Sequence, residues 1–335
     1  MAILITGGSG FVGLALAEAS LIAGDEVVAF GDAPPPPSLH RQLTQTGFQF
    51  VKGDVRSGAD LQRALRAASI DRVIHAAAVT AGPQREADDP QAVIDINVGG
   101  TACLMAILRR STSPIKRVVA MSSASVYGFS EPGRSGRLRE EASCPAPAAL
   151  YGITKHAAEQ TALRLGQVYG IDTRAIRMGS VFGPWEYRTP VREVMSPHLQ
   201  VIEIAVAGGT ALLPRRGTGD WIYSRDAARG IRAVLDAKDL QYPVYNLAGG
   251  SVTDLPGWCA AMSQHFPAFS WRTAGADEEP NVIYGLGRDR APLDLGRIGE
   301  NIGYQPSFDL ALAAIDYAQW MRADREAAAN SDYAR

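Results

Sequence analysis

The feature that most constrains this chain is a glycine-rich turn close to its start. Residues 2–13 read AILITGGSGFVG, an apolar run that breaks into glycines and then resumes with helical spacing. Gly7, Gly10 and Gly13 lie three residues apart, so a strand at Ile3–Ile5 would end against the first turn of a helix. Glycines let the backbone approach a pyrophosphate, whose charge the free N–H groups and the helix dipole stabilise. The turn therefore predicts a dinucleotide-binding α/β fold.

Strand-like and helix-like patterns alternate after this turn. Short apolar runs are separated by segments whose apolar residues recur every three or four positions, which is typical of a parallel sheet covered by helices. The expected later strands are residues 26–30, 48–51, 72–78, 116–121, 173–177 and 244–247. We therefore expect an α/β protein with a Rossmann-type, doubly wound parallel sheet.

The alternation weakens in the second half of the chain, where loops and helices rich in arginine follow. We assign residues 1–180 to the dinucleotide-binding domain, with return segments at about 220–250. Residues 181–219 and 251–325 would form a smaller C-terminal α/β lobe that binds the substrate, and residues 326–335 a polar tail.

Asp32 bears on the choice of cofactor. It follows the glycine turn by about 20 residues, where a carboxylate accepts hydrogen bonds from ribose hydroxyls and repels a 2′-phosphate, which favours NAD over NADP. A simpler interpretation is that Asp32 only begins the turn at Pro34–Pro37, because Gly31 directly ends the strand. The other expected cofactor contacts are Gly7, Gly10, Phe11 and Val12 in the turn, Asp54 and Val55 at the adenine, and the small Ala76 and Ala77.

The candidate chemistry begins at the serine cluster Ser122–Ser125, which follows an expected strand, and continues at Tyr151 and Lys155. The last two residues are four apart and share one helix face, so the ammonium can lower the phenol pKa from about 10, together with an oxidised nicotinamide. Tyr151 then becomes a general base. Such pairs are common on helix surfaces, and it is the serines and the glycine turn that favour catalysis.

Eight motifs together resemble those of extended short-chain dehydrogenases/reductases of the NAD-dependent epimerase/dehydratase family, over almost the whole chain. They are Thr6–Gly13, Gly53–Val55, Val73–Ala77, Asn97–Thr101, Ser122–Gly128, Tyr151–Lys155, Arg177–Pro184 and Asp220–Tyr223. The resemblance implies that Ser123 orients the substrate hydroxyl, Tyr151 is the acid/base, Lys155 binds the nicotinamide ribose and Asn97 supports the cofactor site. It also implies a homodimer in which two helices of each chain pair into a four-helix bundle.

The chain also departs from the family pattern. Dehydratases of the family carry an Asp-Glu pair where this chain has Ala124 and Ser125, so we do not expect water elimination. Many nucleotide-sugar members carry an Asn and an Arg, which grip the diphosphate, at the places of Ser180 and Gly219. Arg188, Arg192 or Arg216 in the second lobe could replace these donors, or could hold the carboxylate of a small substrate. The expected substrate contacts are Thr80, Ser123, Ser125, Ser180, Arg188 and Arg216.

The residues fit NAD-dependent hydride transfer at a secondary alcohol carbon of a sugar, sugar acid or related small hydroxy compound. We favour a small substrate whose ketone leaves, which makes the enzyme a dehydrogenase/reductase. If the ketone stayed bound, turned over and was reduced on its other face, the enzyme would be a nucleotide-sugar epimerase similar to UDP-glucose 4-epimerase, with tightly held NAD. A third alternative is a non-enzymatic NAD-sensing module, which would not need Ser123, Tyr151 and Lys155.

The composition limits the kinds of binding partner that we expect. The 335 residues are 46% hydrophobic with a net charge of -2, which gives no basic footprint for nucleic acid. The three cysteines, Cys103, Cys144 and Cys259, are widely spaced and read as free thiols, not as a disulfide set or a metal site. Met1 opens directly into a strand, and we expect a cytoplasmic enzyme that binds no membrane.

Overall fold

The glycine turn lies where a parallel sheet changes its winding direction. The computed structural model of the protein describes residues 2–43, 47–128, 130–132, 135–189, 192–285 and 289–332. Within these ranges, seven strands form a parallel sheet in the order β11-β6-β5-β4-β1-β2-β3. They are β1 (Ala2–Thr6), β2 (Glu26–Gly31), β3 (Phe48–Lys52), β4 (Ile70–His75), β5 (Arg117–Ser123), β6 (Thr173–Met178) and β11 (Val244–Leu247). Because β1 pairs with both β2 and β4, the switch point of this doubly wound sheet lies beside the glycine turn.

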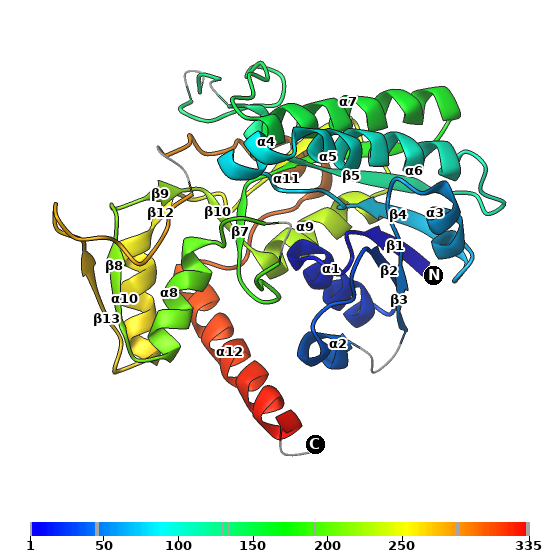
Figure 1. Cartoon of the computed structure of the whole chain (residues 1–335). Coiled ribbons are helices and arrows are strands. Elements are labelled where there is room, and N and C mark those ends of the chain that lie inside the picture. The colour runs from blue at the N-terminus through cyan, green and yellow to red at the C-terminus, as the bar shows by residue number, and fades with distance from the viewer. Residues whose placement is uncertain are drawn as a thin grey trace.

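Helices cover both faces of the sheet (Figure 1). One layer holds α1 (Phe11–Ile22) and α9 (Ser224–Asp236), and the other holds α3 (Gly58–Leu65), α6 (Gly100–Leu108) and α7 (Leu150–Tyr169). Successive side chains of a strand point to opposite faces. Ile3 and Ile5 accordingly pack in the core with Leu14 of α1, whereas Leu4 packs with Leu104 of α6. This burial on both faces explains why β1 reads as a continuous apolar run.

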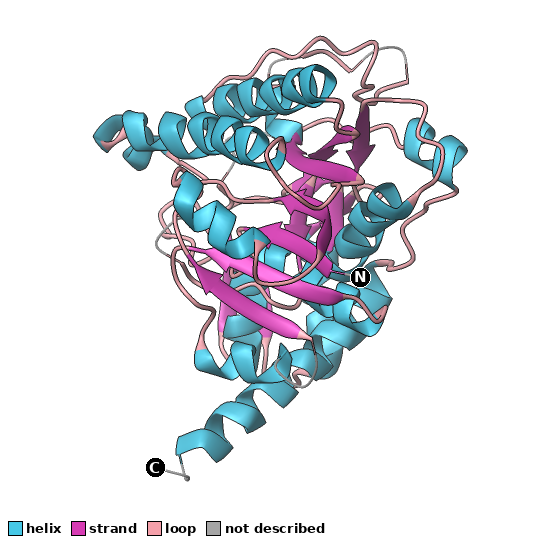
Figure 2. Cartoon of the chain, turned by 90° about the vertical axis from the view of Figure 1, so that its right-hand side faces the viewer, coloured by secondary structure: helices cyan, strands magenta, loops and turns pink. Residues whose placement is uncertain are grey.

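A second apolar core lies beside the sheet, and Figure 2 shows the last helix extending away from the body of the protein. This second core is built by α8 (Pro197–Val206), β8 (Thr210–Leu213), α10 (Leu255–His265), β13 (Ser270–Thr273) and α12 (Leu310–Asp332). Two strand pairs join this core to the sheet: β7 (Ser180–Phe182) with β10 (Trp221–Tyr223), and β9 (Thr218–Gly219) with β12 (Thr253–Asp254). The remaining helices are α2 (Pro37–Leu43), α4 (Pro83–Asp88), α5 (Pro90–Ile94) and α11 (Gly296–Ile302). The domain boundaries drawn from the sequence stay a prediction, and α12 continues into the expected tail.

The stretch Pro90–Leu108, which joins α5, a π-helical turn and α6, is long and apolar enough to cross a membrane by length and composition alone. Its most apolar window is 44% buried in the fold, and core helices of folded domains meet the same criteria, so this is weak evidence for a membrane span. Ile94, Ile153 and Val168 nevertheless leave apolar surface exposed on α5 and α7. The homodimer stays a prediction that this surface would suit.

His198 lies in the centre of the second core. Its ring stacks on Phe182 with centroids 4.0 Å apart and meets the edges of Trp221 and Trp258. The side chain is fully buried, neither ring nitrogen has a hydrogen-bond partner, and burial lowers the pKa of His198 to about 3. The imidazole is therefore neutral in the folded protein.

We expect His198 to make the protein sensitive to acid. An unfolded histidine takes up a proton below about pH 6.5, and the folded one does so only near pH 3, so stability is full above pH 6.5 and is lost as the pH falls between these values. His198→Phe should abolish about 2 kcal/mol of the stability lost between about pH 7.5 and 5.0. Urea unfolding at the two pH values measures this, with His265→Phe as control. An unchanged pH dependence in His198→Phe would contradict the expectation.

Candidate active site

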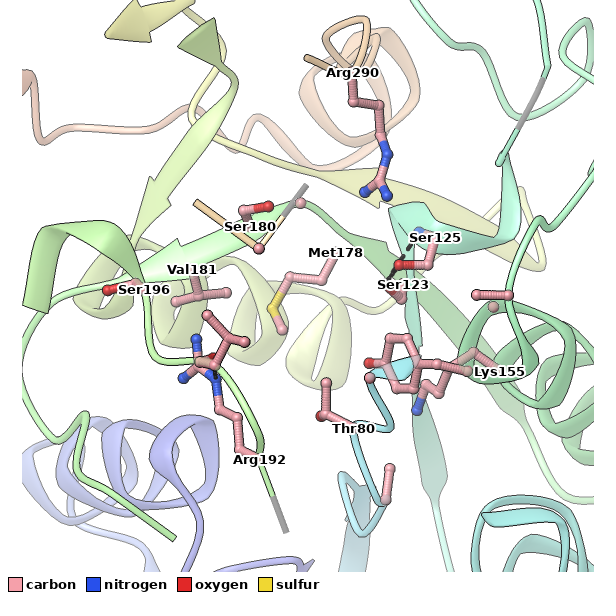
Figure 3. A pocket seen from close by; sticks show the side chains of 18 of the residues that line it. Thr80, Ser123, Ser125, Lys155, Met178, Ser180, Val181, Arg192, Ser196 and Arg290 are labelled. Carbon is pink, nitrogen blue, oxygen red and sulfur yellow. Dashed lines mark hydrogen bonds between the residues drawn. The ribbon is translucent and has the colours of Figure 1, made fainter. Parts of the chain in front are cut away.

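A cavity of about 870 Å³ opens at the carboxyl ends of β1, β4, β5 and β6. Its lining begins at the glycine turn, passes Ser123 and Tyr151, and reaches Tyr284 and Arg290 at the far end. Figure 3 shows side chains from several elements converging on this space. The cavity thus joins the predicted phosphate site to the predicted catalytic residues.

The glycine turn has the geometry that a dinucleotide needs. Gly7 has a φ of +68°, and a Cβ at this position would lie 2.7 Å from the Ala77 nitrogen. A Cβ on Gly13 would lie 2.2 Å from the Gly7 oxygen, so the helix packs directly on the turn. Gly10 caps α1 without a side-chain hydrogen bond, which leaves the first N–H groups of the helix available to an anion. The residues present therefore fit the pyrophosphate of NAD.

The residues expected at the adenosine end lie outside the cavity lining. Asp32 is exposed directly after β2, where a Cβ on Gly31 would lie 2.7 Å from the Ser9 hydroxyl, so the serine leaves room only for glycine. Both oxygens of Asp54 accept hydrogen bonds from Arg56, at 2.6–3.1 Å. Val55 is buried against α6. Their contacts with the cofactor stay predictions, whereas Gly7, Gly10, Phe11, Val12 and Ala76 line the cavity.

Ser123, Tyr151 and Lys155 come together as predicted from their spacing (Figure 3). Ser123 ends β5, and its hydroxyl accepts a hydrogen bond from the Ser125 nitrogen at 3.1 Å and donates one to the Ser125 hydroxyl at 3.2 Å. Tyr151 and Lys155 extend from the first turns of α7. The Tyr151 phenol is also within a hydrogen bond of the Ser123 and Thr80 hydroxyls. A hydroxyl donor and a phenol thus face one reaction space.

The pKa of the Tyr151 phenol is raised in the protein alone, and its lowering by Lys155 together with an oxidised nicotinamide stays a prediction. Burial raises this pKa, and the hydrogen bonds from Ser123 and Thr80 and the charges of Arg192 and Arg290 oppose the rise. Burial also lowers the pKa of Lys155 to about 8, against the charge of Glu159. Because both groups are desolvated, each disfavours its charged form until further charge enters the cavity.

A chain of buried hydrogen bonds fixes α7 relative to the glycine turn. His75 accepts or donates at both ring nitrogens, to the Thr6 hydroxyl at 2.7 Å and to the Thr101 hydroxyl at 2.9 Å. Thr101 donates to the carbonyl of Asn97, whose amide donates to Thr154 of α7 at 3.0 Å. Asn97 also makes two bonds to the backbone of Val79. Asn97 therefore acts on the site through the backbone and α7, since it does not line the cavity.

A buried ion pair supports the serine cluster from below. Arg177 of β6 donates to both carboxylate oxygens of Glu159, at 2.7 and 3.0 Å, and the Ser122 hydroxyl donates to the same carboxylate at 2.7 Å. Glu159 is one helical turn after Lys155, so the pair ties the catalytic helix to the ends of β5 and β6. Bidentate, fully satisfied pairs of this kind hold a fixed geometry.

The substrate end of the cavity differs from the expectation in its arginines. Thr80, Ser125 and Ser180 line the cavity as predicted. Arg188 and Arg216 do not line the cavity. They point to solvent, where Arg188 pairs with Glu203 and Arg216 pairs with Asp254. Arg192 and Arg290 line it instead, from opposite sides (Figure 3). The positions of these arginines in the sequence of a loop-rich lobe do not indicate which of them face the cavity.

Arg192 is held in place on several sides. Its guanidinium lies 5.6 Å from the ring centre of Phe11 and pairs with the buried Glu186 at 2.8 Å. Burial raises the pKa of Glu186, and Arg192 opposes that rise. The arginine thus joins the start of α1 to the second lobe.

Gly219 is explained by Trp221. A Cβ on Gly219 would lie 2.6 Å from the indole Nε1 of Trp221 and 3.0 Å from its Cε2. The indole therefore occupies the space through which any larger side chain at position 219 would extend. Trp221 itself lines the cavity, edge-on to Tyr284.

Comparison with known proteins identifies the family. Residues 3–248 match the NAD dependent epimerase/dehydratase family. The chain belongs to this family. UDP-glucuronate 4-epimerase 4 from Arabidopsis thaliana is 26% identical over 95% of this chain and 74% of its own length. A dTDP-glucose 4,6-dehydratase from Xanthomonas campestris is 28% identical over 91% of this chain and 88% of its own. The structure of a UDP-glucuronic acid 4-epimerase from Bacillus cereus, with UDP-glucuronic acid and NAD, has a TM-score of 0.77, 22% identity and coverage of 96% and 99%.

Membership of the epimerase/dehydratase family makes the protein an NAD-dependent enzyme of the extended short-chain dehydrogenase/reductase type. The family, the fold and the cofactor predicted from the sequence are thus confirmed. The relatives include epimerases and dehydratases, and at the two positions after Ser123 this family member carries Ala124 and Ser125, neither of them an acid.

Tyr151→Phe should reduce turnover at least hundredfold, because a positioned general base contributes about 10² to 10⁴ in rate. NAD affinity should stay within about threefold, since the glycine turn is untouched. Tyr169→Phe, at the far end of the same helix, is the matched control. Steady-state kinetics and NAD titration measure both effects. A loss of activity below tenfold in Tyr151→Phe would contradict the general-base role.

Proposed function

We propose that the protein is an NAD-dependent epimerase of a nucleotide sugar whose sugar carries a carboxylate, such as UDP-glucuronate. The observation that carries this proposal is one continuous cavity, which runs from the glycine turn past Tyr151 to Arg290 and Tyr284. Its volume lies near the upper end of the range of about 300–1,000 Å³ for ligand pockets. The cavity thus offers space beyond the cofactor end, and the similarity to UDP-glucuronate 4-epimerases supports the same substrate class.

The residues suit oxidation of a secondary alcohol followed by reduction of the ketone. Bound NAD supplies the acceptor, and later the donor, of the hydride. The Tyr151 oxygen takes the proton of the hydroxyl group while Ser123 holds the substrate oxygen by a hydrogen bond. The same phenol returns the proton after the ketone has turned its other face. Lys155, which titrates near pH 8, supplies positive charge beside the phenol while it is protonated.

The absence of an acid pair after Ser123 favours epimerisation over dehydration. Elimination of water needs a general acid and a base next to the ketone, and Ala124 is apolar while Ser125 is bonded to Ser123. Ala124 and Ser125 therefore offer a bound ketone no route to elimination, which favours its return to an alcohol.

We assign Arg192 and Arg290, two arginines of the described cavity lining, to the two anionic groups of such a substrate. Arg290 lies at the end of the cavity away from the glycine turn, beside Ser180 and Trp221, and suits the diphosphate. Arg192 lies between Phe11 and Glu186 and acts on the Tyr151 phenol, so it suits a carboxylate on the sugar ring. The two guanidiniums would replace the Asn and Arg side chains that the family pattern has at the positions of Ser180 and Gly219.

The direct test is to incubate the NAD-loaded enzyme with UDP-glucuronate, UDP-glucose, dTDP-glucose and free glucuronate. We expect UDP-glucuronate to be interconverted with its 4-epimer, seen by NMR, without net formation of NADH at 340 nm. Steady NADH formation with free sugar acids, and no isomerisation of nucleotide sugars, would instead establish the dehydrogenase.

The arginine assignments predict different losses. Arg290→Met should weaken binding of UDP-glucuronate and UDP-glucose alike, by about 10- to 100-fold in KM, because charge-assisted hydrogen bonds contribute roughly 1.5–3 kcal/mol. Arg192→Met should weaken UDP-glucuronate by a similar factor and UDP-glucose much less. Arg188→Met and Arg216→Met, which remove arginines outside the cavity, are the matched controls. Equal losses for both substrates in Arg192→Met would contradict the carboxylate assignment.

A further inference from the structure

The chain that leaves β7 crosses from the second lobe to the glycine turn, where it runs beside α1 (Figure 1). Trp185 donates from its indole nitrogen to the Glu18 carboxylate of α1 at 3.0 Å. Two residues later, the Tyr187 hydroxyl donates to the carbonyl of Ser9, inside the turn, at 2.7 Å. Both contacts span more than 160 residues of sequence, and they hold the segment against α1 in the core beside the sheet, where Trp185 is buried.

This crossing is held against a conformational cost. Trp185 has a φ of +73°, and among the described residues it is the only non-glycine with a positive φ. Such a conformation is unfavourable for a bulky residue and persists only when its surroundings impose it. The indole is 2% exposed and packs near Trp320 of α12, and Glu18 also accepts a hydrogen bond from Arg225 of α9 at 2.8 Å. Three helices thus fix the backbone at Trp185.

Tyr187 contacts the turn and borders the cavity beside it. Its side chain lines the cavity together with Gly10, Phe11 and Val12, whose N–H groups begin α1. Burial raises the pKa of Tyr187, and the charge of Asp32, the residue expected at the ribose, adds to the rise. A pyrophosphate on the turn would therefore lie between the helix N-terminus and this ring.

We propose that the segment Trp185–Tyr187 is a strap that retains NAD between catalytic cycles. The cofactor can leave the turn only when the Tyr187 hydroxyl separates from the Ser9 carbonyl, and the fixed backbone at Trp185 resists that separation. Retention suits an epimerase, whose NAD is regenerated in every cycle, whereas a dehydrogenase must exchange it. The inference rests on the cofactor and stands apart from the choice of sugar substrate.

Dissociation of NAD tests the strap without any turnover. The full-length protein is loaded with NAD, freed of excess by gel filtration and mixed with an excess of fluorescent 1,N6-etheno-NAD, whose uptake reports the release of NAD. Tyr187→Phe removes only the hydroxyl and should speed release by about three- to tenfold, the factor expected for one hydrogen bond. Tyr304→Phe is the matched control, since its hydroxyl donates to the Asp226 carbonyl at 2.8 Å away from the cavity. It should leave the release rate unchanged.

Trp185→Phe provides a second variant, which keeps an aromatic ring and removes the bond to Glu18. It too should speed release, and thermal unfolding of the cofactor-free proteins verifies that each variant is folded. Release at the parent rate in folded Tyr187→Phe and Trp185→Phe would overturn the strap, as would equal acceleration in Tyr304→Phe. The strap and the proposed substrate are tested separately. A variant can release NAD quickly and still epimerise normally, and the protein can release NAD slowly without epimerising UDP-glucuronate.

Discussion

The hydrogen-bonded chain from Thr6 to Thr154 is the constraint on which the rest of the site depends. Hydride transfer needs the cofactor and the catalytic phenol at a fixed separation, yet the glycine turn and α7 are about 140 residues apart in sequence. Thr6, His75, Thr101 and Asn97 bridge that gap through buried side chains. Because each polar group is satisfied by the next, loss of one would leave its neighbour buried without a partner. The chain thus converts local strand ends into one rigid frame.

This frame also determines the protonation of the site. Burial lowers the pKa of His75 to about 3, with the charge of Lys155 adding to the effect, so its imidazole stays neutral and can accept at one nitrogen while donating at the other. Burial acts on Tyr151 and Lys155 in the same sense, against the charged form. The hydrogen bonds with Ser123 and Thr80, and after them the charges of Arg192 and Arg290, are what favour the phenolate in the protein alone. The geometry is therefore built in advance, and the charge state responds to what enters the cavity.

Sequence reasoning succeeded where a local pattern decides the structure. The glycine spacing requires a tight turn into a helix, and a spacing of four places Tyr151 and Lys155 on one helix face, whatever the rest of the chain does. It was less successful in the second lobe, where Arg192 lines the cavity but the candidates Arg188 and Arg216 do not, and where Arg290 was not among the candidates. Which arginine faces the cavity depends on partners such as Glu203 and Glu186, which follow no period. The bonds of Asp54 to Arg56 were equally invisible to motif spacing.

The glycine at position 219, where the family pattern has an arginine, also depends on packing in the second lobe. An arginine at this position and the indole of Trp221 exclude each other, because both need the space 2.6 Å from the position 219 Cβ. The indole is edge-on to His198 and Tyr284, so it is part of the aromatic core of the second lobe as well as of the cavity wall. Under the proposed function, positive charge for the diphosphate then has to come from another part of the wall, and Arg290 lines that part. Packing in the second core thus decides which strand or loop carries the residue that binds the charged group of the substrate.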